Sequence, residues 1–170
     1  MKRYDDAIEL WQQVLELEND MPIAYLNMST AYMEFGDYKA GLEASKKALH
    51  LDPGLKEAAL NYSTCVLCAG DSKNAILILE TLLEHVPDHP VAMALLSGAY
   101  CISKDKEKAF EMMNRINKLG FECGNYIVDL VERLVSSNRI ESGILLLEGA
   151  VESGNDTLKI RERLDGLLIR

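Results

Sequence analysis

The chain lacks long apolar runs and clusters of basic residues. Its longest apolar stretches, such as residues 143–147, are far too short to span a bilayer, which argues against a membrane-spanning helix. No basic run exceeds the pair Lys46–Lys47, and the formal net charge is −9. Because such a chain repels phosphate backbones, we do not expect nucleic acid as a partner. A hydrophobic content of 48% excludes a disordered chain.

The sequence also lacks the motifs of an enzyme. It has no G-x-S-x-G nucleophile turn, no glycine-rich phosphate loop and no strand pattern that would position either. Acidic pairs such as Asp5–Asp6 are typical of solvated surfaces rather than of paired catalytic carboxylates. We therefore predict a non-catalytic protein that needs no cofactor.

Cysteine is sparse, and its spacing indicates neither disulfides nor a metal site. Cys65 and Cys68 lie less than one helical turn apart, while Cys101 and Cys123 come much later in the chain. Four thiolates are therefore not expected to meet at one zinc ion, and we predict no metal. Free thiols suit a reducing compartment, and no secretory signal precedes the first helix, so we predict a cytoplasmic location.

What the sequence does contain is a strict 34-residue repeat. Small residues recur at this interval, without insertion or deletion, at Ala7, Gly41, Ala75, Ala109 and Gly143. Spacing of this kind is typical of stacked helical hairpins, in which each unit packs only against its neighbours. Such arrays carry their function on an extended surface, so the repeat predicts a binding scaffold.

Turn-forming residues follow the same interval and predict where the helices end. Pro53 and Pro87 each follow an apolar helical stretch that a proline can terminate. Half a repeat away, Gly36–Asp37 and Gly70–Asp71 can close one helix and cap the next, and Asn138 has the same place later. We predict helices at 3–17, 22–35, 38–51, 56–69, 72–85, 90–103, 106–118, 124–137, 140–153 and 157–169.

These residues resemble the tetratricopeptide repeat family, whose unit has 34 residues with set large, small and proline positions. The unit at 22–55 matches closely, through Tyr25, Met28, Ser29, Tyr32, Gly41, Ala48 and Pro53. The units at 56–89 and 90–123 follow the pattern, and the unit at 124–157 has drifted furthest. The resemblance covers almost the whole chain and implies an all-α, right-handed superhelical solenoid of antiparallel helix pairs, forming a single array over 1–170.

The two ends of the array are irregular. The first unit, residues 1–21, is only half present, because Tyr4, Ala7 and Trp11 align with the second helix of a unit. A repeat cannot bury its apolar face alone, so we expect an excised segment of a longer protein. The terminal helix, 158–170, is apolar on one face and charged on the other, which suits a capping helix or half of a sixth repeat.

In the resembling family, the first helix of each unit lines a concave groove. The resemblance implies peptide-binding roles for Leu26, Asn27, Thr30, Met33, Glu57, Leu60, Asn61, Thr64, Leu67 and Leu95. No groove position carries Lys or Arg, so the family's carboxylate clamp for chaperone tails is not expected. We predict an apolar groove in which Asn27 and Asn61 pair with a peptide backbone and Glu57 favours a basic residue.

The predicted function is a non-catalytic protein–protein interaction scaffold that binds an apolar to weakly basic protein segment. Other interpretations stay open. Asparagine is common in the family's first helix, and the apolar stripe could pack against missing parts of a longer protein. The array could then be an appendage of a larger enzyme, such as a bacterial glycosyltransferase, used for docking or substrate positioning. It could also self-associate through its end helices, particularly 3–17, which carries Trp11.

Overall fold

The computed structural model describes residues 2–120, 124–154 and 157–169, and this part of the chain is helical with short irregular connections. Its helices are α1 (Lys2–Leu17), α2 (Pro22–Phe35), α3 (Tyr38–Leu51), α4 (Lys56–Ala69), α5 (Ser72–His85), α6 (Pro90–Ile102), α7 (Lys106–Lys118), α8 (Gly124–Ser136), α9 (Ile140–Glu152) and α10 (Leu158–Leu168). The predicted boundaries agree with these to within one residue at each end, and the predicted all-α fold is confirmed.

Residues in the left-handed conformation separate the two helices of each unit. Gly36 and Gly70 have φ angles of 88° and 86°, and their N–H groups donate to carbonyls of the preceding helix. Lys104 and Asn138 continue the series with φ angles of 64° and 61°. Asparagine tolerates this conformation, whereas the Cβ of lysine makes it unfavourable by roughly 1 kcal/mol.

In the units at 22–55, 56–89 and 90–123, an aspartate caps the N-terminus of the second helix. Asp37, Asp71 and Asp105 each accept a hydrogen bond from the backbone N–H three residues later. The equivalent position before α9 holds Arg139, which makes no side-chain cap. Its guanidinium instead donates to the last carbonyls of α4, including that of Cys68 at 2.7 Å. At this position the side chain therefore joins the last unit to α4 instead of capping its own helix.

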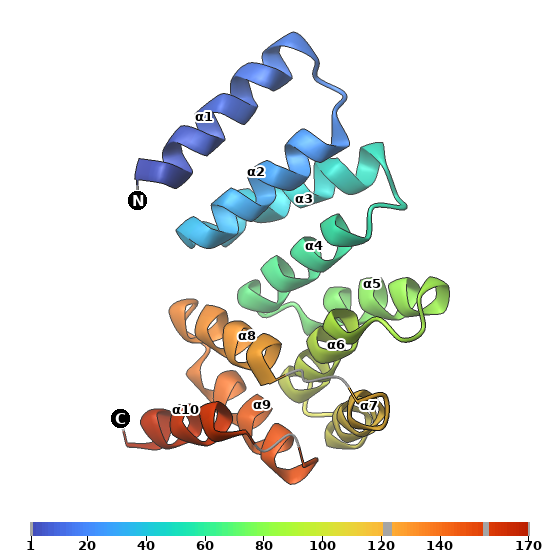
Figure 1. Cartoon of the computed structure of the whole chain (residues 1–170), viewed down its shortest axis with the longest axis vertical. Helices are drawn as coiled ribbons and strands as arrows, with labels where there is room; N and C mark the ends of the chain where they lie inside the picture. Colours follow the sequence, from blue (N-terminus) through green and yellow to red (C-terminus); the bar gives the residue numbers. More distant parts are fainter. Residues whose placement is uncertain (1, 121–123, 155–156, 170) are drawn as a thin grey trace.

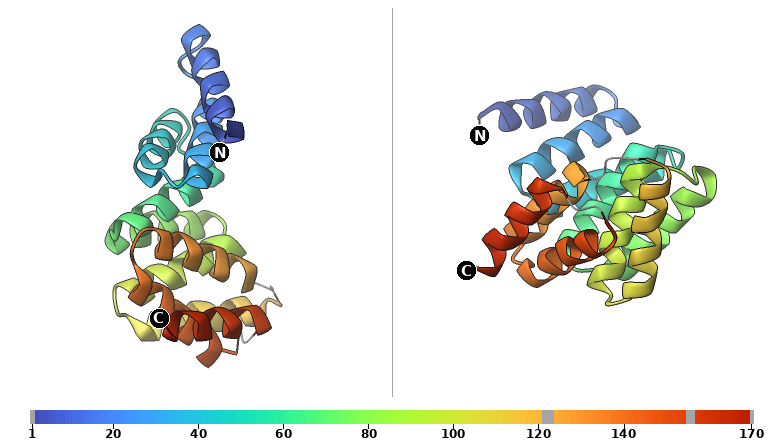
Figure 2. Two further views of the ribbon diagram at one scale, coloured as in Figure 1. Left: turned by 90° about the vertical axis from the view of Figure 1, so that its left-hand side faces the viewer. Right: turned by 60° about the horizontal axis from the view of Figure 1, so that its bottom comes forward.

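Helices α1 to α7 stack in chain order, and the first helices α2, α4 and α6 lie side by side (Figure 1). Figure 2 shows α1 at one end of the elongated molecule and α10 near the other.

The buried apolar residues form two clusters. A small cluster joins α1, α2 and α3 through Ile8, Met28 and Ala44. A large cluster runs from α4 to α10 and includes Met93 and Leu146.

The last unit departs from regular stacking. Among the described residues, α8 makes no contact with α7 and lies instead against α4 and α6, while α9 packs on α6. Figure 1 shows α8 and α7 on opposite sides of α6. A physical reason lies on α7, where Asn117 occupies the position held by the apolar, partly buried Leu49 and Leu83 in the preceding units. Asn117 donates to the carbonyl of Ser153 at 2.8 Å and so offers α8 no apolar surface.

The docked position of α8 depends on close packing at Gly98 of α6. A Cβ atom at Gly98 would lie 2.8 Å from Cδ2 of Leu130 and 3.5 Å from Cδ2 of Leu146. Both contacts come from the last unit, Leu130 from α8 and Leu146 from α9. The missing side chain therefore lets the two helices approach the inner face of α6.

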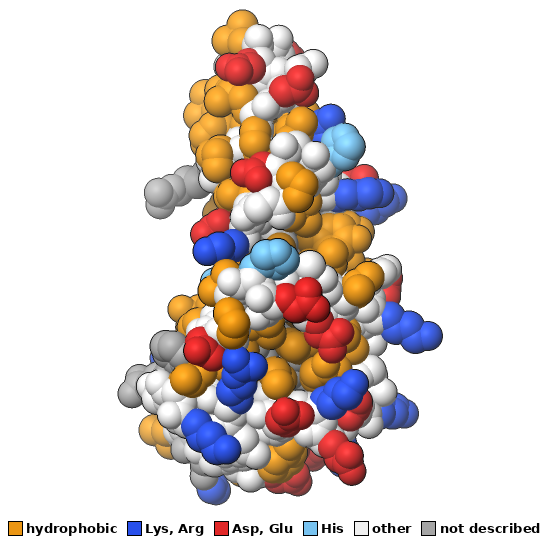
Figure 3. Space-filling view, turned by 90° about the vertical axis from the view of Figure 1, so that its right-hand side faces the viewer, with side chains coloured by type: hydrophobic (Ala, Val, Ile, Leu, Met, Phe, Trp, Pro, Cys, Tyr) orange, Lys and Arg blue, Asp and Glu red, His pale blue; other side chains and the backbone are white. Residues whose placement is uncertain are grey.

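The outer surface carries no large patch of one charge on the face seen in Figure 3, where acidic and basic side chains are interspersed. None of the helices in the described ranges combines the length and the apolar character needed to cross a membrane.

Candidate functional site

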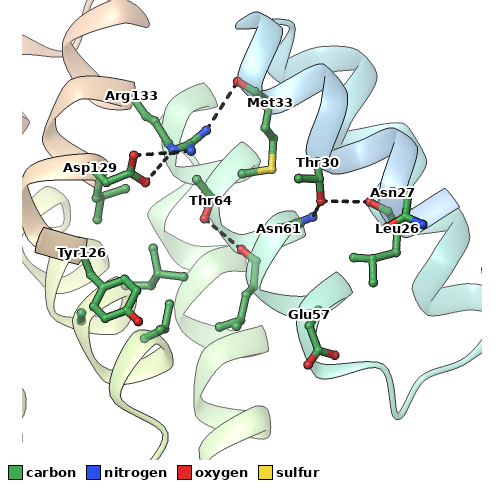
Figure 4. Close-up of a pocket in the computed structure, with 15 residues that line it drawn as sticks. Leu26, Asn27, Thr30, Met33, Glu57, Asn61, Thr64, Tyr126, Asp129 and Arg133 are labelled. Atoms are coloured by element: carbon green, nitrogen blue, oxygen red, sulfur yellow. Dashed lines mark hydrogen bonds and ion pairs between the residues drawn. The ribbon is translucent and has the colours of Figure 1, made fainter. Parts of the chain in front are cut away.

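One cavity of about 390 Å³ lies between the inner helices α2, α4 and α6 on one side and α8 on the other (Figure 4). We call it the groove. It is lined by Leu26, Asn27, Thr30 and Met33 of α2, Glu57, Leu60, Asn61 and Thr64 of α4, Val91, Ala94 and Leu95 of α6, and Tyr126, Asp129, Leu130 and Arg133 of α8. Nine of the ten residues predicted for peptide binding are therefore gathered around one cavity.

Helical spacing explains how α2 and α4 supply their walls. Leu26, Thr30 and Met33 are separated by four and three residues, so their side chains share one face of α2. Glu57, Leu60 and Thr64 lie on one face of α4 for the same reason. The hydroxyls of Thr30 and Thr64 donate to carbonyls one turn earlier, at 3.2 Å and 2.9 Å, so these polar atoms are satisfied within their own helices.

The two asparagines differ in what they can offer a ligand. Asn61 Nδ2 donates to Ser29 Oγ at 2.9 Å and to Thr30 Oγ1 at 3.0 Å, which ties α4 to α2 across the groove floor. Both amide hydrogens of Asn61 are thus used, and only its carbonyl oxygen remains for a peptide N–H. Asn27 lies half-buried in the lining, and its side chain has no hydrogen-bond partner among the described residues, so both of its polar groups can face a ligand.

Leu67 does not contribute to the groove. It is fully buried in the large cluster and does not line the cavity, so in this structure a peptide in the groove would not reach it. The reason is the docked last unit, because α8 lies against α4 and covers this end of its inner face. Leu95 and Thr64 remain in the lining, although each is only 7% exposed.

The α8 residues that line the groove were not among the predicted site residues. Tyr126, which is half-exposed, and Arg133 both line the cavity, so the groove does contain a cation. Arg133 stands where the preceding units have the small buried residues Ala31, Cys65 and Ala99. An arginine replacing a small core residue at the repeat interval was the available signal that this helix packs differently.

Arg133 is held by carboxylates on both sides of the groove. Its Nε donates to Asp129 Oδ2 at 2.9 Å, and its Nη2 donates to Glu34 Oε1 at 2.7 Å. Burial alone would lower the pKa of the guanidinium, but the hydrogen bonds and charges of Asp129 and Glu34 outweigh burial and raise the pKa above its ordinary value. Arg133 therefore stays charged, and its donors are directed to the chain itself.

The described cysteines are buried thiols. Burial raises the pKa of Cys65 and Cys101 to about 12 and that of Cys68 to about 11. Such thiols are neutral and unreactive at physiological pH. Cys123 lies outside the described residues. Across the described residues, no group of three His, Cys, Asp or Glu side chains is arranged to hold a metal ion.

The chain is similar in sequence to larger proteins. It is 37% identical over 81 residues to mitochondrial import receptor subunit TOM70 of Saccharomyces cerevisiae, a match that covers 48% of this chain and 13% of TOM70. It is 22% identical over 160 residues to tetratricopeptide repeat protein 28 of Homo sapiens, covering 93% of this chain and 6% of that protein. The chain thus spans a small part of these relatives. No protein-family model matches it.

Solved structures share its fold. A MamA fragment from Desulfovibrio magneticus RS-1 aligns over 95% of this chain and 88% of its own, with a TM-score of 0.68 and 22% identity. YrrB, a tetratricopeptide repeat protein described as having an unusual peptide-binding site, aligns over 95% and 84%, with a TM-score of 0.66 and 14% identity. The repeat protein TTC0263 of Thermus thermophilus aligns over 99% and 92%, with a TM-score of 0.64 and 18% identity.

These findings agree with the 34-residue pattern and with the observed helix pairs. The predicted resemblance is confirmed, and the chain has the superhelical solenoid fold of the tetratricopeptide repeat family.

Proposed function

We propose that the chain is a non-catalytic interaction scaffold that binds a protein segment in the groove. The observation that supports this proposal is that nine residues, expected in the groove from the family resemblance, line one cavity of about 390 Å³. Cavities of this size with mostly apolar walls and a few polar groups are typical of binding sites. The peptide-binding site described for YrrB, which shares the fold, supports the same interpretation.

The lining favours an apolar segment with a basic residue. Leu26, Leu60 and Val91 supply apolar surface, and Asn27 supplies a carboxamide that can both donate to and accept from a peptide backbone. Glu57 lines the cavity without an ion pair among the described residues, so it can receive a Lys or Arg side chain. An acidic segment is disfavoured because Arg133 already pairs with Glu34 and Asp129.

A peptide-display selection against the purified chain tests this proposal. We expect enrichment of apolar sequences containing a basic residue, with micromolar affinity or about −8 kcal/mol. Leu60→Glu, which introduces a charge into the groove, should weaken the enriched peptide at least about tenfold, or about 1.4 kcal/mol. Asn27→Ala should weaken it less.

The matched control is Leu77→Glu, because Leu77 is 61% exposed on α5 and does not line the groove. This variant should bind the enriched peptide like the wild type. Failure to enrich any peptide on the folded chain would contradict the proposal. Equal weakening by Leu77→Glu and Leu60→Glu would also contradict it, because the effect would then not be specific to the groove.

A second candidate is self-association through α1. Leu10 and Leu17 are 62% and 92% exposed on this helix, which is an unusual amount of apolar surface for one short segment. This function predicts a mass in sedimentation that rises with concentration. Replacing both leucines with Glu should then hold the chain monomeric, whereas a wild-type chain that is monomeric at every concentration would exclude the candidate.

A further inference from the structure

The groove lies between two parts of the chain that have separate apolar clusters. Its α2 wall belongs to the part formed by α1, α2 and α3, whose buried residues make up the small cluster. Its α4, α6 and α8 walls belong to the part formed by α4 to α10, which shares the large cluster. No residue belongs to both clusters, but the two parts are packed together where α3 meets α4. Leu42 and Leu49 of α3 pack on the edge of the large cluster, and the sulfur of the buried Cys65 of α4 lies against Gly41 of α3.

Polar contacts join the two parts across the groove. Arg133 of α8 donates to Glu34 Oε1 at 2.7 Å and to the carbonyl of Met33 at 3.4 Å, both at the C-terminal end of α2. Beside them, the hydroxyls of Tyr38 on α3 and Ser136 on α8 are 3.1 Å apart. Figure 4 shows Arg133 reaching from α8 toward Met33 on α2.

These contacts differ in kind from those that hold each part together. The side chain of Glu34 is 41% exposed and that of Arg133 is 15% exposed, so water competes for their ion pair. Partly exposed pairs contribute little to stability, whereas the apolar clusters on each side are well buried. A tilt of α1–α3 about the α3–α4 packing would therefore break the contacts of α8 with α2 and α3 without disturbing either cluster, whereas the bonds of Asn61 to α2 lie on the groove floor.

We propose that Arg133, Glu34, Tyr38 and Ser136 form a clasp that holds the groove narrow, and that a ligand reaches the groove floor when the clasp opens. The effect of the clasp on ligand binding rests on the proposed function, whereas the clasp contacts themselves are present in the ligand-free chain. Its opening moves α1–α3 away from α8 and leaves both apolar clusters intact. Because only the open form admits the ligand, the apparent affinity is reduced by the open fraction.

A distance measurement on the ligand-free chain tests the clasp. Spin labels replace the exposed Glu16 on α1 and Glu162 on α10, in a Cys123→Ser background in which the described cysteines are buried. Double electron–electron resonance should give a single narrow distance distribution for the clasped chain. The double variant Glu34→Ala, Ser136→Ala should broaden the distribution and shift it to longer distances.

The matched control is Asp129→Asn. Asp129 pairs with Arg133 from within α8, so its loss removes an ion pair without removing a contact across the groove. The distribution should stay as narrow as in the wild type. An unchanged distribution in the Glu34→Ala, Ser136→Ala variant, or equal broadening by Asp129→Asn, would overturn the clasp.

The consequence for binding is measured with a peptide enriched in the display selection. Glu34 does not line the groove, so its replacement tests the clasp rather than a ligand contact. Glu34→Ala should bind the peptide at least about threefold tighter, through faster association. Unchanged or weaker binding would overturn the inference. If the selection enriches no peptide, the proposed function fails, and the distance measurement alone decides the clasp.

Discussion

Arg133, Asn117 and Arg139 each stand where the preceding units carry a different kind of residue. Arg133 replaces small core residues, Asn117 replaces leucine, and Arg139 replaces a capping aspartate. Each of the three now makes a polar contact that a regular repeat does not have. These departures from the repeat accompany the docking of the last unit, whose helix α8 forms the second wall of the groove.

Single-residue chemistry also predicts the behaviour of the buried thiols. Because the folded chain raises the pKa of Cys65, Cys68 and Cys101 above the ordinary 9.0, the unfolded chain binds fewer protons above pH 9. Their contribution to stability is full below pH 9 and is lost as pH rises toward about 11 to 12. At pH 8, mass spectrometry should find these thiols unmodified by iodoacetamide in the folded chain and modified in urea. Rapid modification of the folded chain would contradict their burial.

Lys104 offers a test of backbone strain. It adopts a φ angle of 64° at the position where the preceding units have Gly36 and Gly70. Lys104→Gly removes an unfavourable Cβ and should raise the free energy of unfolding by about 1 kcal/mol, as measured by urea denaturation. Lys46→Gly, at an exposed position in the middle of α3, should lower it by about the same amount. A loss of stability in both variants would show that Lys104 is not strained.

At the scale of helices, the packing of the last unit on α6 depends on the absence of a side chain at Gly98. Gly98→Val would force the new methyl groups into Leu130 and should destabilise the chain by about 1–3 kcal/mol. Gly166→Val on α10 is the control, because a Cβ there meets no atom within 4 Å. Comparable urea midpoints for the two variants would mean that α8 does not pack on α6 as described.

Helix positions were largely predictable from the sequence, whereas the location of the last unit was not. Helix ends depend on local signals such as Gly36 and Asp37, which act within a few residues. The groove residues of α2 and α4 followed from repeat position because these helices stack regularly. Where α8 docks depends on contacts between residues far apart, such as Arg139 with Cys68, and no local pattern reports them.

In the whole molecule, the last unit folds back on the inner face of the array, so the groove has walls on two sides. In stacked helical repeats each unit normally contacts only its neighbours, so the inner face stays open along its length. Here the last unit covers part of that face, including Leu67, and leaves a groove bounded by α2 and α8. A ligand in the groove would therefore contact α2 and α8 at once, which makes binding sensitive to how the two parts tilt.

Photo-crosslinking can locate the segment that binds in the groove. A benzophenone amino acid is incorporated at Tyr126, which is 49% exposed in the α8 wall, and separately at Tyr4, which is 38% exposed on α1. With a peptide enriched in the display selection, we expect crosslinks from position 126 and none from position 4. Crosslinks from position 4 alone would contradict a ligand site in the groove and indicate that the segment binds on α1.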